Sequence, residues 1–180
     1  MSRPIVALAT ALILAGCGGG NEVPDENPDC AWDGMVGETG DVYDGPELQM
    51  GEFEGKDFVA WQDGQALTAT VGPQGDVMLM PYIRVVDGAG EVDEGDERCL
   101  SVYLSYVLAD DDSTDPSVVG EAFNSYVFRA MNGDWVAGPL WAPIYRAWVD
   151  DRYVVELTVR DSEWASQTAM TFDISGGPVP

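Results

Sequence analysis

Carboxylates dominate the side chains that could do chemistry in this 180-residue chain, which has 32 Asp+Glu, 8 Lys+Arg and no His. Without His, the chain lacks the commonest general base and the commonest metal ligand. It also contains no Ser-His-Asp or Cys-His arrangement, no G-x-S-x-G elbow, no phosphate-binding loop and no zinc-ligand spacing. We therefore expect a non-catalytic protein. A carboxylate-dependent glycosidase is kept as an alternative, because two carboxylates can hydrolyse glycosides without His.

Acidic segments could bind Ca2+, which takes about six to eight oxygen ligands. One such segment spans residues 87–98 and another begins at Asp110. Counted from there, positions one, three, five and twelve of a calcium loop are Asp110, Asp112, Thr114 and Glu121. An EF-hand is excluded, because Asp115 stands where glycine is required and no flanking helices are expected. We expect solvated surface loops and no cofactor, with loop-bound Ca2+ as the alternative.

Six tryptophans are the other candidates for binding. Indole combines a large apolar face with a hydrogen-bond donor, so an exposed row of Trp could bind sugar rings or a partner protein. Trp61 and Trp135 each adjoin an expected turn, and we expect these two to be exposed. The alternative is that the tryptophans fill the core.

The N-terminal residues indicate export and lipidation. Arg3 precedes an apolar run from Ile5 to Ala15, which is typical of a secretion signal and too short for a membrane-spanning helix. The run ends in Leu14-Ala15-Gly16-Cys17, which resembles the lipobox of bacterial lipoproteins. This resemblance implies cleavage before Cys17 and acylation of its sulfur and amine. Gly18 replaces the aspartate that retains enterobacterial lipoproteins in the inner membrane, so the resemblance implies the outer membrane of a Gram-negative bacterium.

Three segments follow from this interpretation. Residues 1–16 are the signal peptide, residues 17–29 are the lipidated Cys and a flexible acidic tether, and residues 30–180 form one domain. The formal charge of -24 and pI near 4.1 exclude electrostatic attraction to nucleic acid. The expected partners are a membrane, held through the lipid anchor, and a protein or glycan ligand.

Cys30 and Cys99 are expected to form a disulfide, because an exported compartment is oxidising and two cysteines remain after Cys17. A catalytic thiol is disfavoured, since no His is present to lower its pKa. Apolar residues alternate from Leu100 to Leu108, which predicts that Cys99 faces away from the core. The disulfide would then hold the end of the tether on the surface of the domain.

Strand patterns fill the rest of the chain, and none of it sustains a helical period. The alternation is clearest at Arg152–Arg160, where Tyr153, Val155, Leu157 and Val159 are expected to face inward. Asn132-Gly133 predicts a tight hairpin. The other expected strands are Leu48–Glu52, Phe58–Gln62, Ala66–Val71, Asp76–Val86, Cys99–Ala109, Phe123–Met131, Leu140–Val149 and Ser166–Ile174. Eight or nine strands predict an all-β fold, an antiparallel immunoglobulin-like β-sandwich, with a closed β-barrel as the alternative.

A second resemblance covers residues 48–86. Met50-Gly51-Glu52, Asp63-Gly64 and Gly72-Pro73-Gln74-Gly75-Asp76, followed by Tyr82-Ile83-Arg84-Val85, resemble a family of uncharacterised lipoproteins from myxobacteria and their relatives. Asp76 and Met78 depart from that pattern, in which glycine and histidine often stand. The family has no assigned activity, so the resemblance implies class and location alone.

These observations together predict a membrane-anchored, non-catalytic envelope lipoprotein that acts as a binding or surface-interaction module. One alternative is a calcium-stabilised adhesion or carbohydrate-binding domain. The other is the carboxylate-dependent glycosidase.

Overall fold

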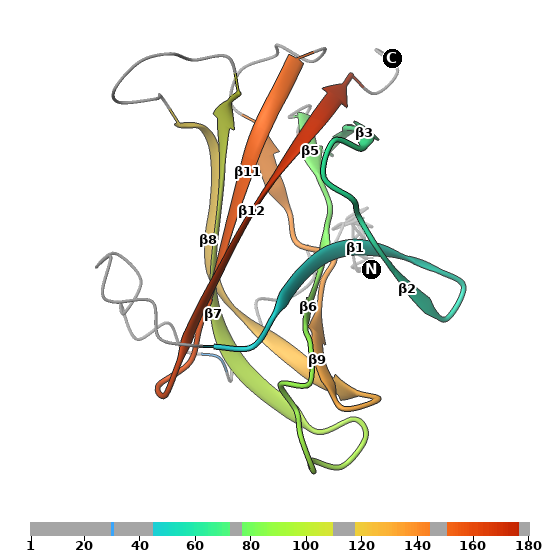
Figure 1. The fold of residues 1–180 in the computed structure, drawn as a ribbon, viewed down its shortest axis with the longest axis vertical. Coiled ribbons are helices and arrows are strands. Elements are labelled where there is room, and N and C mark those ends of the chain that lie inside the picture. Colours follow the sequence, from blue (N-terminus) through green and yellow to red (C-terminus); the bar gives the residue numbers. More distant parts are fainter. Residues whose placement is uncertain (1–29, 31–44, 73–76, 110–117, 145–150, 177–180) are drawn as a thin grey trace, which may run out of the picture.

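Two β-sheets make up the regular structure of the protein (Figure 1). The computed structural model describes residues 30, 45–72, 77–109, 118–144 and 151–176. The strands within these ranges are β1 (Leu48–Glu54), β2 (Asp57–Ala60), β3 (Ala66–Thr68), β4 (Thr70–Val71), β5 (Val77–Leu79), β6 (Tyr82–Val85), β7 (Glu97–Leu108), β8 (Val118–Met131), β9 (Asp134–Ala137), β10 (Ala142–Ile144), β11 (Asp151–Arg160) and β12 (Ala165–Ser175). The described residues contain no helix, so the all-β prediction is confirmed.

The larger sheet has nine strands in the order β2-β1-β6-β9-β8-β7-β11-β12-β3. Its pairs are antiparallel except β12–β3, which is parallel. The smaller sheet has the order β10-β5-β4. A curled large sheet with a small sheet beside it is consistent with a β-sandwich or a half-open barrel.

The long strands form because their side chains alternate. In β11, Tyr153, Val155, Leu157 and Val159 are buried, while the residues between them are partly exposed. In β7, Leu100, Val102, Leu104 and Tyr106 are buried in the same way. This period of two places one face of each strand in the core and the other toward solvent, as the sequence predicts.

The large sheet curls until its first and last strands approach one another. Trp61, which follows β2, packs edge-to-face on Phe172 of β12, with 5.7 Å between the ring centroids. The chain after Trp61 then hydrogen-bonds along β12: the amide of Gly64 donates to the Thr171 carbonyl at 2.7 Å, and the Thr171 amide donates to Asp63 Oδ1 at 2.7 Å. These bonds lead into β3, so a strand that follows one edge of the sheet is added to its opposite edge.

The small sheet covers the inner side of β7 and β8 at one end. Tyr106 is fully buried, and its hydroxyl donates to the Ala142 carbonyl of β10 at 3.4 Å. A Cβ atom at Gly120 would lie 2.4 Å from the Pro143 carbonyl oxygen, so only glycine lets β8 approach β10 this closely. β10 therefore covers the core at that end of the sheet.

The structure differs from the predicted strand list at several places. The predicted strand Ala66–Val71 is two short strands in different sheets, β3 and β4, and β8 begins at Val118 instead of Phe123. Of the predicted strand Leu140–Val149, the structure shows β10, and residues 145–149 lie outside the described residues. The predicted strand Asp76–Val86 is two strands in different sheets, β5 and β6, because Pro81 between them has no amide hydrogen for a ladder bond. The sequence analysis missed β9, which is four residues long and buried at every position. It pairs with β8 through Asn132-Gly133, whose φ angles of 54° and 87° confirm the predicted hairpin turn.

Replacing Tyr106 by Phe tests how the core responds to alkaline pH. Burial raises the pKa of Tyr106 above its ordinary value of 10.0, so above about pH 10 the unfolded chain loses this proton while the folded chain keeps it. The free energy of unfolding should therefore fall as pH rises past that value, and less steeply in Y106F. At neutral pH, loss of the long hydrogen bond should cost about 1 kcal/mol or less. Urea unfolding at about pH 8 and about pH 11 measures both effects. An equal loss of unfolding free energy between these pH values in the wild type and in Y106F would contradict the raised pKa of Tyr106.

Candidate functional site: the outer face of the large sheet

The two tryptophans predicted to be exposed are in the core. Trp61 is 7% exposed and Trp135 is 3% exposed, so the prediction that they form an exposed binding pair is wrong. Trp61 turns inward onto Phe172, and Trp135 lies on β9, which is enclosed between β6 and β8. A nearby turn says little about exposure when the strand beside it lies in the middle of a sheet.

The predicted calcium ligands are only partly within the described residues. Asp110, Asp112 and Thr114 lie outside them. Glu121 is exposed on β8, opposite Ser105 of β7. In the part of the chain that the structure describes, no three or more His, Cys, Asp or Glu side chains are grouped so as to hold a metal ion.

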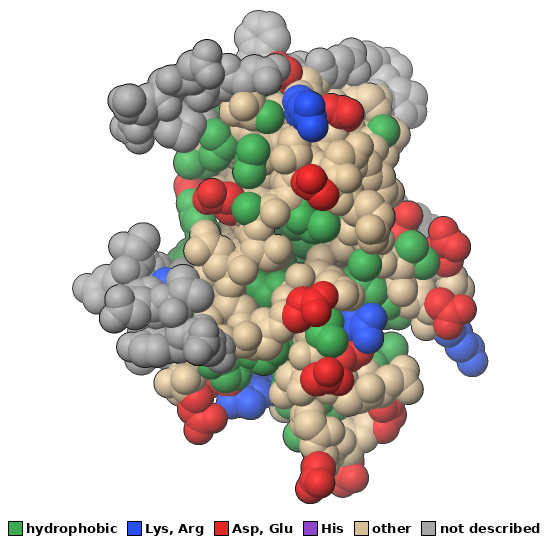
Figure 2. Space-filling model, in the orientation of Figure 1, with side chains coloured by type: hydrophobic (Ala, Val, Ile, Leu, Met, Phe, Trp, Pro, Cys, Tyr) green, Lys and Arg blue, Asp and Glu red, His purple; other side chains and the backbone are tan. Residues whose placement is uncertain are grey.

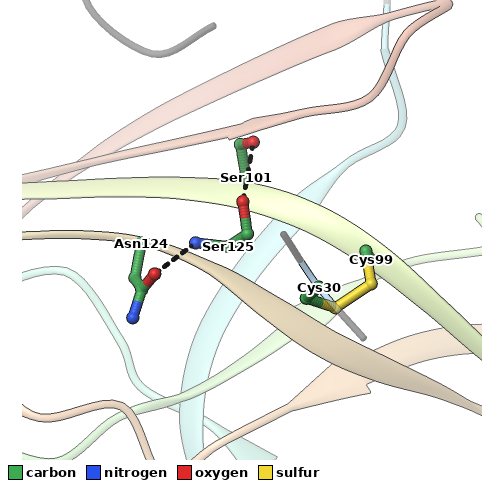
Figure 3. The surroundings of a disulfide bond; sticks show 5 residues. All are labelled: Cys30, Cys99, Ser101, Asn124 and Ser125. Carbon is green, nitrogen blue, oxygen red and sulfur yellow. Dashed lines mark hydrogen bonds between the residues drawn. A yellow bond between two sulfur atoms is a disulfide. The ribbon is translucent and has the colours of Figure 1, made fainter. Parts of the chain in front are cut away.

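The predicted disulfide is present, and it joins Cys30 to Cys99 with 5.5 Å between the two Cα atoms. Cys99 is exposed on β7, on the face opposite Leu100, as the alternation predicts. Beside the disulfide, Ser101 and Ser125 face one another across β7 and β8, with 3.4 Å between their hydroxyl oxygens (Figure 3). The bridge therefore fixes the chain at Cys30 to the solvent side of the sheet.

The disulfide lies at one end of a surface that we call the outer face. It consists of the side chains that the middle parts of β8, β7, β11 and β12 direct away from the core: Val127, Ser125, Phe123, Glu121, Cys99, Ser101, Tyr103, Ser105, Val107, Arg160, Thr158, Glu156, Val154, Gln167, Ala169 and Thr171. Strand register arranges them in rows, such as Phe123–Tyr103–Thr158–Gln167. Three of these side chains are charged, namely Glu121, Glu156 and Arg160. At the two ends of the same strands, the outward side chains form the ion pairs Arg129–Glu97 and Arg152–Asp173, which bound the outer face.

An aromatic pair stands near the centre of the outer face. The rings of Tyr103 and Phe123 meet edge-to-face, with 6.0 Å between their centroids. Burial raises the pKa of Tyr103, and the negative charges of Glu121 and Glu156 raise it further. The Tyr103 side chain therefore lies close to both carboxylates, one from each neighbouring strand.

A shallow hollow of about 370 Å3 lies at the other end of these strands, lined by Ala66, Asp151, Arg152, Asp173, Ile174 and Ser175. Cys99 and Leu108 are nine residues apart on β7, so the hollow and the disulfide are separated by about 30 Å along the sheet. The charged side chains of the hollow are solvated: Arg152 Nε and Asp173 Oδ1 are 3.8 Å apart, and both side chains are more than half exposed. Such a pair contributes little to stability or chemistry.

A buried carboxylate, Asp134 of β9, has a structural role. It accepts hydrogen bonds from Arg84 Nε at 2.6 Å and from the Asp87 amide at 2.8 Å. Asp87 has a φ of 53°, and the bond from its amide holds this conformation where the chain leaves β6. Each oxygen of this carboxylate thus accepts a hydrogen bond from a residue that it orders.

Comparisons with known protein families, with curated proteins and with solved structures found no match to this chain. Among the described residues there is no helix long and apolar enough to cross a membrane. Figure 2 shows one side of the molecule, where carboxylates are scattered over the surface with few basic side chains among them. The outer face contrasts with this pattern, because polar uncharged, aliphatic and aromatic side chains make up most of it.

One part of the outer face could be predicted from the sequence, and the other part could not. Alternation along β7 identified Cys99, Ser101, Tyr103 and Ser105 as outward residues. The neighbours of these residues on β8 and β11 come from strand register, which a single sequence does not reveal. The signal in the sequence that could have indicated this surface is the absence of charge at positions 99, 101, 103 and 105, in a chain that is otherwise strongly acidic.

Removing the disulfide should destabilise the domain without opening its core. The bridge joins residues 69 apart, and the chain-entropy treatment assigns about 4 kcal/mol to closing a loop of that length. We expect the C30S/C99S double variant to unfold with a free energy lower by up to that amount. Its slope against urea concentration should be equal or steeper, because the unfolded chain without the bridge is less compact. Reduction should lower the stability of the wild type but leave the double variant unaffected. A lower slope would show that the bridge also orders the native core.

Proposed function

We propose that this protein is a lipid-anchored, non-catalytic envelope module of a Gram-negative bacterium, which binds a partner through its outer face. The proposal joins two lines of argument. The lipobox-like Cys17 and the acidic tether support anchoring to the outer membrane. The low charge of the outer face and its central aromatic pair support binding.

The composition of the outer face is the observation that carries the binding function. Protein-binding surfaces are depleted of charged residues at their centre and enriched in aromatic ones. A chain with 32 acidic residues needs no uncharged face for solubility. Its outward-facing strands nevertheless present Tyr103 and Phe123 among Ser, Thr and Val side chains. A surface of this kind suits contact with another molecule better than contact with water alone.

The disulfide supports a particular orientation for such a module. The tether would join the domain at Cys30, which Cys99 holds at one end of the outer face. The strands continue for about 30 Å beyond that point. The centre and far end of the outer face would therefore extend away from the attachment point and stay accessible to a partner.

The two alternatives have weaker support. A calcium-stabilised adhesion or carbohydrate-binding domain would require Asp110, Asp112 and Thr114, which lie outside the described residues, to complete a site with Glu121. A glycosidase would require its two carboxylates to flank the bound sugar in a cleft. Glu121 and Glu156 stand on a sheet face, and neither lines the hollow described above.

Substitution of Cys17 tests the anchoring. The acyl chains on Cys17 would hold the protein on the membrane, because each buried CH2 contributes about 0.8 kcal/mol and several chains bind together. In the native bacterium, we expect the wild type in the membrane fraction and the C17S variant mostly in the soluble fraction. Mass spectrometry of the N-terminal peptide should show the acyl groups on Cys17. An unmodified N-terminus in membrane-bound protein would contradict the proposed anchor.

Site-specific photocrosslinking in intact cells tests the outer face as the binding surface. A photoreactive residue in place of Thr158 or Ala169 should form a discrete adduct, because both positions lie on that face. The same residue in place of Glu52 is the control, since Glu52 is exposed on β1 outside the outer face. Adducts that form equally at all three positions, or at none of them, would contradict the proposal.

A further inference from the structure

Strand register places two carboxylates of the outer face on either side of one small residue. Ser105 of β7 is opposite Glu121 of β8 and opposite Glu156 of β11. Neighbouring strands lie about 4.8 Å apart, so the two Glu backbones are about 10 Å apart. Ser105 itself is 2% exposed. A glutamate thus stands on each side of a covered serine, and Tyr103 lies beside both carboxylates.

The described surroundings supply little positive charge to this row. Arg160 of the outer face stands two rows away along β11, and Lys56 lies in the turn between β1 and β2. Its fourth member is Ala169, and the adjacent row contains Phe123, Tyr103, Thr158 and Gln167. Across the described residues, four arginines are already in ion pairs with other carboxylates, as Arg84–Asp134, Arg98–Asp161, Arg129–Glu97 and Arg152–Asp173. The formal net charge of -24 adds a long-range attraction for cations.

We propose that the row of Glu121, Ser105 and Glu156, together with Tyr103 and Phe123, is a docking site for a basic segment of a partner protein. An ammonium or guanidinium group would lie over Ser105 between the two carboxylates. The aliphatic part of the same Lys or Arg side chain would pack on the aromatic pair, since these side chains bury their stems while their charged ends stay solvated. Two carboxylates are too few for Ca2+, which takes about six to eight oxygen ligands.

This inference rests on the proposed function and names its partner class, and the test is binding of a lysine peptide to the purified protein. The probe is a dye-labelled synthetic peptide that alternates valine with lysine, and fluorescence anisotropy measures its affinity. The same peptide with acetylated lysines keeps the shape and loses the charge. We expect the lysine peptide to bind, the acetylated peptide to bind at least about tenfold more weakly, and added salt to weaken the first alone.

Paired variants locate the site. In E121Q/E156Q, the affinity for the lysine peptide should fall about tenfold, as expected for the loss of close charge pairs. The matched control is E52Q/E54Q, which removes the same charge from exposed positions of β1 and should change the affinity less than about twofold. Equal losses in the two variants would overturn the proposal, because they would show attraction to the overall charge.

Other occupants would give different results. Binding of a neutral oligosaccharide in place of the lysine peptide would assign the face to glycans and overturn the proposal. Binding of neither ligand would overturn it too. If outer-face photocrosslinking succeeds in cells while the lysine peptide fails, the binding function stands and only the basic partner is wrong. If the crosslinks are absent, the binding function itself fails.

Discussion

Side chains of β7 and β11 point alternately to the two faces of the sheet, and only one face is apolar enough to be buried. A slip of one residue would move Tyr153 and Leu157 into water and place Glu156 in the core. Burying a large apolar side chain contributes about 1.5–3 kcal/mol, so the native register is favoured strongly over the slipped one. The same register decides which residues form the outer face, because it selects the neighbours of Cys99, Tyr103 and Ser105 on both sides. Core packing and candidate binding surface are thus two consequences of one alternation.

The disulfide depends on that alternation as well. Because Leu100 is buried, Cys99 must face solvent, and its partner Cys30 is held outside the core. The bridge can therefore stabilise the domain by restricting the unfolded chain without any need for new core contacts. It also sets where a tether would meet the domain.

Local sequence patterns predicted the features that depend on neighbouring residues. They identified the all-β class, the inward residues of β7 and β11, the Asn132-Gly133 turn and the outward direction of Cys99. They did not predict the features that depend on tertiary contacts. Trp61 is buried because the curled sheet brings Phe172 of β12 against it, although the two residues are far apart in sequence. In the same way, Glu121 and Glu156 become neighbours of Ser105 only through pairing with β8 and β11, so this row could not be seen in the sequence.

The charge of this molecule would act on a partner in two ways. The net negative charge attracts cations at long range, and the contacts of the outer face would select among them at short range. Four described arginines are held by carboxylates, among them Arg84 by the buried Asp134, and the whole chain keeps a formal net charge of -24 after all its basic groups are counted. The field of this charge attracts any cation, and salt screens it beyond about 10 Å. Selection must then come from short-range contacts, for which a surface crowded with carboxylates is poorly suited because each desolvated charge costs free energy. The outer face avoids this cost over most of its area, since it places two glutamates beside one aromatic pair and surrounds them with uncharged side chains. A partner attracted by the whole molecule could therefore be distinguished by how well it fits this one row.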